Sequence, residues 1–391
     1  MNTELIRRYA SEIREEALSY RRYFHAHPEL GFEETGTTAR LASILEENHI
    51  PYVLNPGSTG LIARIQGQKP GKVLAFRSDI DALPVPELTG LPYASETPGK
   101  MHACGHDFHM GLLLAFGLTM ARHPEEVEGT IVLIFQPNEE HYPGGAQGMI
   151  ASGLLSDVDA FYGYHVAPEY PTGSICCMDG YVMACVTTFR IHIKGKSCHG
   201  SKPQDGADPI VAAAQIILGL QTIVSRNAHP CERIVVSCGQ IHAGSCENII
   251  PETAFLEGTI RTYTDEALTL VTGRMKAITE GIAASMGVFA EVEFEYSYPA
   301  VYNAPEHASR IRAAAEELGI RVLSDVYPSM VGEDFTYYLR YKTGGHFFLG
   351  VGGDGSGPYY ALHSSYMAPD ENAMQVGCEL LLNLYEKAKE A

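Results

Sequence analysis

The most concentrated group of chemically capable side chains lies in the segment MHACGHDFHM, residues 101–110. It holds one thiol, Cys104, and three imidazoles, His102, His106 and His109. Thiolate sulfur and imidazole nitrogen are common ligands of zinc. The segment therefore indicates a metal site, and two alternatives stay open from these residues alone: a cysteine nucleophile and a purely structural cluster.

A second group follows the apolar run TIVLIFQP, residues 130–137, which is typical of a strand buried on both faces. Glu139 and Glu140 are adjacent carboxylates directly after this run. An unpaired carboxylate is costly to bury, so a carboxylate pair in this position usually has a function. One can bind a metal ion while the other serves as a general base. A solvated pair at a strand end is the alternative.

Two single histidines complete the set. His165 ends the next apolar run, VDAFYGYHVA, and His363 lies in the turn-rich segment ALHSSYMAPDE. A single histidine is more often structural than a ligand, but these groups all fall at predicted strand ends of one domain. Together they offer five donor groups, which suits a two-metal centre with ions about 3.5–4 Å apart. The donors are Cys104, His106, Glu140, His165 and His363.

The elements around these residues alternate between helix and strand. Apolar spacing predicts helices over 3–24, 36–48 and 111–123, with short β-branched runs between them. This alternation predicts an α/β domain with a largely parallel central sheet. Cys104 and His106 are expected on a loop before the third helix, where sites in such domains commonly lie.

The pattern changes near residue 185 and changes back near residue 300. Four alternating strands and two helices, one starting at Pro209 and one over 264–285, predict a compact α+β unit. We therefore expect a discontinuous domain of residues 1–184 and 300–391, with a second domain of residues 185–299 inserted into it.

Composition limits the partners. The chain has 391 residues and a formal net charge of −19, which repels nucleic acid and anionic lipid. No run of 18 apolar residues predicts a membrane span. Nine cysteines and a charged N-terminal segment without a signal pattern favour reduced thiols and a cytoplasmic location.

The motifs together resemble a known family. The chain is similar to the dinuclear-metal aminoacylase/carboxypeptidase amidohydrolases, in particular the hippurate and indole-acetyl-amino-acid hydrolase group. The similarity extends from near residue 21 to near residue 371. The matching segments are RRYFHAHPELGFEE, RSDIDALP, MHACGHDFHMGLLL, FQPNEE, GGAQGMI, GYHVAP, KGKSCHGSKPQDGADPI, ENIIPETAFLEGTIRT, VGEDFTYYL and LHSSYMAPDE.

The resemblance implies a function and a role for each site residue. The implied reaction is hydrolysis of the amide bond of N-acyl amino acids, hippurate-like or acetylated, by a hydroxide held between two divalent ions (Zn, Mn, Co or Ni). The five donors would bind the ions, and Glu139 would be the general base. His199 would stabilise the oxyanion, Asn248 and Arg261 would hold the substrate carboxylate, and Asp79 and Asp81 would orient ligand imidazoles. The inserted domain would be a lid or dimerisation domain, so a homodimer is expected.

Some positions depart from the family pattern. Asn138 stands where a small residue is usual, His141 and Tyr142 interrupt a glycine-rich run, and Cys198 replaces a glycine before His199. These departures concern the acyl and side-chain pockets. Two other functions stay open: a cysteine hydrolase that uses Cys104 and His106, and a non-catalytic metal- or peptide-binding protein on the same fold.

Overall fold

The computed structural model describes residues 1–324, 326–356 and 359–390, and it divides into two compact units. The first unit comprises Met1–Val182, Tyr302–Tyr327 and Asp334–Ala391, and the second comprises Met183–Val301 and Pro328–Glu333. Each unit has its own hydrophobic core. The short strands β7 (Gly180–Met183) and β14 (Val301–Asn303) lie where the chain passes between the units.

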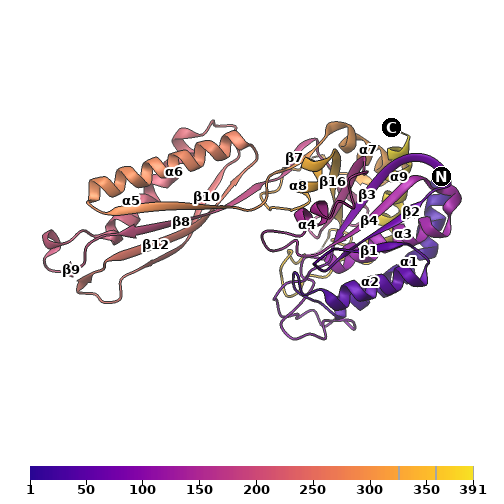
Figure 1. The fold of residues 1–391 in the computed structure, drawn as a ribbon, viewed down its shortest axis with the longest axis horizontal. Helices are drawn as coiled ribbons and strands as arrows, with labels where there is room; N and C mark the ends of the chain where they lie inside the picture. Colours follow the sequence, from indigo (N-terminus) through magenta and orange to yellow (C-terminus); the bar gives the residue numbers. More distant parts are fainter. Residues whose placement is uncertain (325, 357–358, 391) are drawn as a thin grey trace. The chain divides into compact units, whose positions relative to one another are not determined.

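The first unit is built on an eight-stranded sheet of order β1-β2-β4-β3-β5-β16-β6-β15 (Figure 1). Its four central strands β4, β3, β5 and β16 run parallel. The strands are β1 (Tyr52–Leu54), β2 (Leu61–Gln66), β3 (Lys69–Asp79), β4 (Glu128–Gln136), β5 (Ala160–Ala167), β6 (Ser174–Cys176), β15 (Arg321–Val322) and β16 (Gly344–Gly350).

Helices cover both faces of this sheet. Helices α1, α3, α7 and α9 contribute to the larger core on one face, and α4 and α8 contribute to a smaller core on the other. The helical segments are α1 (Thr3–Ala26), α2 (Thr35–Glu47), α3 (His106–Arg122), η1 (Pro124–Glu126), α4 (Ala146–Ala151), α7 (Pro305–Glu317), α8 (Thr336–Tyr341) and α9 (Ala373–Lys389).

Strand β4 shows why its sequence is continuously apolar. Ile131, Leu133 and Phe135 pack into the larger core, whereas Val132 and Ile134 pack into the smaller one. Alternate side chains of a strand point to opposite faces, so a strand covered on both sides needs apolar residues at every position. The predicted α/β class with a largely parallel sheet is confirmed.

The second unit is a four-stranded antiparallel sheet of order β10-β12-β8-β13, with α5 and α6 on one face (Figure 1). A separate two-stranded pairing joins β9 to β11. The elements are β8 (Cys185–Lys194), β9 (Cys198–His199), η2 (Pro203–Asp205), α5 (Pro209–Thr222), η3 (Ile223–Asn227), β10 (Val235–Ala243), β11 (Ile249–Ile250), β12 (Thr253–Thr262), α6 (Asp265–Met286) and β13 (Phe289–Tyr296).

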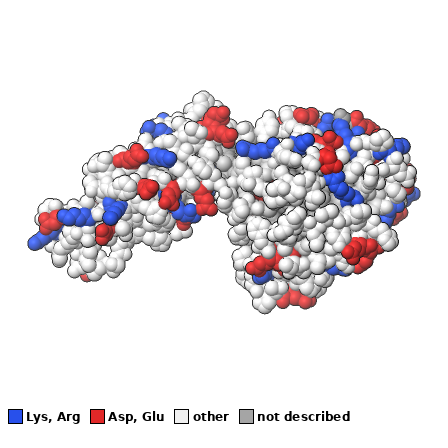
Figure 2. Space-filling model, viewed as in Figure 1, with Lys and Arg blue, Asp and Glu red and all other residues white. Residues whose placement is uncertain are grey.

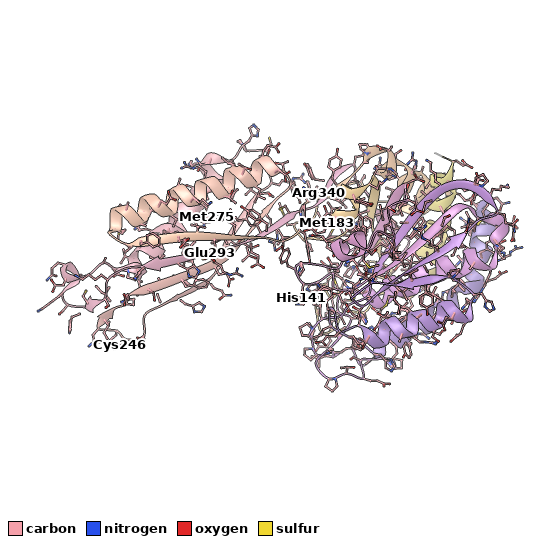
Figure 3. The ribbon with its side chains drawn as sticks, viewed as in Figure 1. His141, Met183, Cys246, Met275, Glu293 and Arg340 are labelled. Atoms are coloured by element: carbon pink, nitrogen blue, oxygen red, sulfur yellow. The ribbon has the colours of Figure 1, made fainter. Side chains whose placement is uncertain are left out.

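The two faces of this second sheet differ. Phe189, Ile191 and Ile193 of β8 are buried beneath the helices, and Met275 of α6 packs against the same core. Glu293 of β13 lies on the other face and is exposed (Figure 3). One face is therefore covered by helices and the other carries polar side chains, which confirms the predicted inserted α+β fold.

Two surface properties bear on partners. Lys and Arg occur in small groups beside Asp and Glu on the face drawn in Figure 2, which shows no broad basic surface among its described side chains. The helical segment Pro209–Asn227 is long and apolar enough to cross a membrane by length and composition. Such a segment is weak evidence alone, because the core helix of a globular domain meets the same criteria.

Candidate metal centre

The parallel strands bring most of the expected ligands to one edge of the first sheet. Asp79 is the last residue of β3, Glu139 and Glu140 follow β4, and His165 lies near the end of β5. Because β4, β3 and β5 are parallel neighbours, these carboxyl ends meet at the same edge. The parallel pairing of these strands thus brings three strand ends, far apart in the sequence, into one site.

Cys104 and His165 face each other directly. Sγ of Cys104 lies 3.3 Å from Nε2 of His165, and both side chains are buried. Nδ1 of His165 donates to the Val166 carbonyl over 2.7 Å, so Nε2 keeps its lone pair. Burial, followed by the neighbouring His109, lowers the pKa of His165 to about 3. His165 is therefore a neutral imidazole, which is the form that binds metal ions.

His106 is the first residue of α3, not a loop residue as expected, because the helix begins five residues earlier than the apolar pattern predicts. Its Nδ1 donates to the backbone carbonyl of Asp81 over 2.9 Å and lies 3.2 Å from the Asp81 carboxylate. Nε2 is fully buried and has no hydrogen-bond partner among the described residues. The ring is therefore fixed from one side and offers its other nitrogen to the site.

The charges around His106 favour a cation. Burial alone would lower its pKa, but the carboxylates of Asp79 and Asp81 raise the pKa of His106 to about 10. Nε2 also lies 3.9 Å from Oε1 of Glu140. A divalent ion would supply the positive charge that these carboxylates stabilise.

His363 reaches the same centre from the loop before α9. Its Nε2 lies 3.3 Å from Oε1 of Glu140, and its backbone N–H donates to the Ala103 carbonyl over 2.8 Å. The residue has a left-handed backbone with φ of 68°. Few non-glycine residues adopt this conformation, and it is often found at functional sites.

The donor atoms are close enough to share ions. Three groups of His, Cys and carboxylate atoms each lie within 4.8 Å of one another, and they overlap through shared members. The set of sulfur, nitrogen and oxygen donors suits zinc and similar divalent ions. The groups are Cys104, His106 and His165; Cys104, Glu140 and His363; and His106, Glu139 and Glu140.

The environment of Cys104 opposes a free nucleophilic thiolate. Burial, together with the nearby carboxylates of Glu140 and Glu139, raises the pKa of Cys104 well above its ordinary value. A reactive cysteine needs a lowered pKa and partial exposure. A thiolate at this position needs a cation beside it, so the geometry fits a metal ligand and not a cysteine hydrolase.

His109 is close to the centre but is already engaged. Its Nδ1 lies 2.6 Å from Oδ1 of Asp79, and its Nε2 accepts from the backbone N–H of Val166 over 3.0 Å. Both ring nitrogens are therefore used within the protein. The third imidazole of the motif orders Asp79 and β5 and does not present a free donor atom.

Sequence reasoning missed a buried network behind Asp79. Arg77 donates to Asp79 Oδ2 over 2.7 Å and to Asp334 Oδ1 over 2.8 Å. Asp334 also accepts from the side-chain amide of Gln136. The segment VGEDF, which carries Asp334, was among the matching motifs, but its partner Arg77 lies 257 residues away. No local pattern could have paired them.

In the second unit, His199 and Asn248 lie together. β9 and β11 pair so that Ile249 is opposite His199, and Gly200 N–H donates to the Asn248 carbonyl over 2.7 Å. The imidazole of His199 is exposed, and its Nδ1 is 2.8 Å from the Ser201 hydroxyl.

Arg261 is separate from this pair. Its Nε donates to the Met330 carbonyl over 3.1 Å, and burial lowers its pKa. Asn248 precedes β12 and Arg261 lies near the end of that strand. At about 3.3 Å per residue, roughly 25 Å separates the two ends. Arg261 therefore lies toward the far end of β12 from Asn248.

Comparison with known proteins defines the class. Residues 75–387 match the model of peptidase family M20/M25/M40, and the chain belongs to this family of metal-dependent amidohydrolases. The N-acetyl-L-cysteine deacetylase of Bacillus subtilis is 39% identical over 379 residues, which cover 97% of this chain and 89% of the relative. The N-acetyldiaminopimelate deacetylase of the same organism is 37% identical, covering 95% of this chain and 98% of the relative.

A solved structure supports the same class. The YxeP protein of Bacillus subtilis, described as a dinuclear metal binding peptidase from the M20 family, superposes with a TM-score of 0.86. It is 36% identical, and the match covers 97% of this chain and 99% of that one. The narrower similarity to hippurate and indole-acetyl-amino-acid hydrolases stays a prediction.

Proposed function

We propose that the protein releases amino acids from N-acyl amino acids by hydrolysing the amide bond, with N-acetyl amino acids as the first substrates to test. Benzoyl and indole-acetyl amino acids are the second group of substrates to test. The observation that carries the proposal is the convergence of Cys104, His106, Glu140, His165 and His363 beside a further carboxylate, Glu139. The deacetylase relatives support the acetyl group as the first choice.

The five donors would hold two divalent ions, with Zn, Mn, Co and Ni as the candidates. When bound, such ions polarise the amide carbonyl and lower the pKa of water. The chain's own residues prepare this site: Asp81 fixes the ring of His106, and the Val166 carbonyl fixes the tautomer of His165. These partners orient the ligands before any ion binds.

Glu139 is the proposed general base. Its side chain is buried, 6% exposed, and it offers an oxygen within 4.8 Å of donor atoms of His106 and Glu140. Its carboxylate would take a proton from the attacking water and return it to the nitrogen of the leaving amine. A pure binding protein needs no second carboxylate, so this pair favours an enzyme.

His199, Asn248 and Arg261 are proposed to contact the substrate. An imidazole N–H of His199 would donate to the developing oxyanion, and Asn248, its neighbour, would orient the same end of the substrate. Arg261 presents a guanidinium that suits a carboxylate. Because Arg261 lies at the other end of β12, it is assigned a separate contact.

A homodimer through the second unit is proposed as the assembly. Only a third of the apolar segment Pro209–Asn227 is buried, and Leu218 is 65% exposed. Ile241 of the edge strand β10 is also half-exposed. A second copy of this chain would cover both features, and His199 could then serve the partner's site.

The decisive experiment combines metal content with turnover. The purified protein is analysed for metals per chain and assayed for amino acid release from acetyl, benzoyl and indole-acetyl substrates, with and without a chelator. Chelator-sensitive release supports the proposal. Release that ignores the chelator would support a cysteine hydrolase, and bound metal without any release would support a binding protein.

A further inference from the structure

The peptide segment that carries Glu139 and Glu140 is held at both ends by buried carboxylates. Glu34 Oε1 accepts the backbone N–H of Asn138 over 2.9 Å, and Asp81 Oδ2 accepts the backbone N–H of Glu140 over 3.0 Å. Glu139 lies between these two anchored amides. The Asp81 contact belongs to the metal centre described above, but the Glu34 contact has no part in it.

Glu34 has no exposed surface. It occupies the N-cap position of α2, yet its side chain makes no capping hydrogen bond. The side chain of Glu29 caps α2 instead: its carboxylate accepts hydrogen bonds from the backbone N–H groups of Gly36 and Thr37 over 3.0 and 2.7 Å. The Glu34 carboxylate accepts instead from Asn138 and, through Oε2, from the Thr59 hydroxyl over 2.6 Å.

The anchored backbone is in an uncommon conformation. Asn138 is a non-glycine residue with φ of 48°, in the left-handed region. Its side-chain amide donates to the His141 carbonyl over 2.7 Å, which closes the turn around Glu139 and Glu140. Asparagine tolerates this conformation better than most residues, and the surrounding contacts hold it here. The hydrogen bond from Asn138 to Glu34 is one of these contacts.

We propose that Glu34 is a positioning residue for the general base: its buried carboxylate fixes Asn138 and thereby the direction in which Glu139 presents its side chain. This inference rests on the proposed function of Glu139. Glu34 does not contact substrate or the ligand set and acts only through the backbone. Burying a carboxylate is costly, and the two donors that Glu34 meets, the Asn138 N–H and the Thr59 hydroxyl, offset part of that cost.

The test compares three variants of the full chain. Glu34→Ala removes both hydrogen bonds. Glu34→Gln keeps them, because the amide oxygen can accept from Asn138 and the amide nitrogen can donate to Thr59. Glu29→Ala is the matched control, since it removes a partly buried carboxylate of the same segment whose hydrogen bonds go to Gly36 and Thr37 and not to Asn138.

Glu34→Ala is expected to lower kcat by about 10- to 100-fold with KM and metal content unchanged. Glu34→Gln is expected to restore most of kcat, and Glu29→Ala to lower only the melting temperature. A second readout is local: amide exchange in the peptide that contains residues 137–141 should become faster in Glu34→Ala and not in Glu29→Ala.

Equal kcat values for folded Glu34→Ala and Glu29→Ala would overturn the inference. If Glu34→Ala does not fold, Glu34→Asp decides, because its shorter side chain withdraws the carboxylate from the Asn138 N–H. A wild-type kcat in that variant overturns the inference, and a reduced one supports it. The absence of amino acid release by the wild-type enzyme would count against the proposed function instead.

Discussion

Asp81 holds His106 and Glu140 with one carboxylate: Oδ1 lies 3.2 Å from Nδ1 of His106, and Oδ2 accepts the backbone N–H of Glu140. His106 begins α3 and Glu140 follows β4, so a single side chain fixes two proposed ligands from different elements. Burial alone would raise the pKa of Asp81, but the hydrogen bond from His106 lowers it, and the group is ionised at neutral pH.

Asp81→Asn should therefore weaken metal binding more than it affects folding. The neutral amide accepts a weaker hydrogen bond from His106, and we expect metal affinity to fall by about 10- to 100-fold. Chelator competition measures this affinity. Asp157→Asn is a suitable control, because Asp157 pairs with Arg64 in an exposed salt bridge. Unchanged affinity in Asp81→Asn would contradict the assignment of His106 as a ligand.

Glu139→Gln should stop turnover without releasing metal. The amide cannot take a proton from water, so kcat should fall by about 10²- to 10⁴-fold, while metal content stays at the wild-type level. Amino acid release and elemental analysis of the same preparation give both quantities. Glu33→Gln, at an exposed carboxylate in the chain, is the control. Near-wild-type turnover in Glu139→Gln would assign the base elsewhere.

The stability of the protein should depend on pH through Glu34. Burial raises the pKa of Glu34 to about 7, above its ordinary value of 4.5. Between these values the folded state keeps a proton that the unfolded state has lost. The contribution of Glu34 to the free energy of unfolding is therefore greatest below pH 4.5. It decreases as the pH rises to about 7 and is constant above that.

Glu34→Gln does not titrate and isolates this effect. The free energy of unfolding of wild type minus that of Glu34→Gln should fall by up to about 3 kcal/mol between pH 4.5 and 7. Urea denaturation of both proteins at several pH values measures the difference. A difference that does not change with pH would show that Glu34 has an ordinary pKa in the folded protein.

His199 is predicted to act across the proposed dimer. A chain with His199→Ala and a chain with Glu139→Ala should each be inactive alone. Mixing them with subunit exchange should recover part of the activity, because hybrid dimers contain one site with both groups. Leu218→Lys should reduce dimer content in light scattering and abolish this recovery. If mixing recovers no activity while hybrid dimers form, His199 acts within its own chain.

Much of the site was predictable because parallel strands align their carboxyl ends. Apolar runs before Glu139 and His165 identified β4 and β5, and their parallel pairing with β3 then places Asp79 beside them. The start of α3 was not predictable from apolar spacing, since its first turn carries His106 and Asp107 in place of apolar residues. Both are buried, so tertiary contacts and not periodicity decide that boundary.

The polar partner of Glu34 could not be predicted. Glu34 and Asn138 are 104 residues apart, and nothing in the sequence around Glu34 distinguishes it from Glu33, which is exposed. The left-handed backbone of Asn138 was equally hidden, although asparagine tolerates that conformation better than most residues. The replacement of a small residue by Asn138 was visible in the sequence, but its reason appears only in the folded chain.

The buried, neutral thiol of Cys104 has a practical consequence. Oxidation and alkylation proceed through the thiolate, and this thiol has both a raised pKa and little exposed surface. In protein stripped of metal, Cys104 should therefore resist oxidation and alkylation at neutral pH. Activity that is lost when the metal is removed should therefore return in full when the metal is restored.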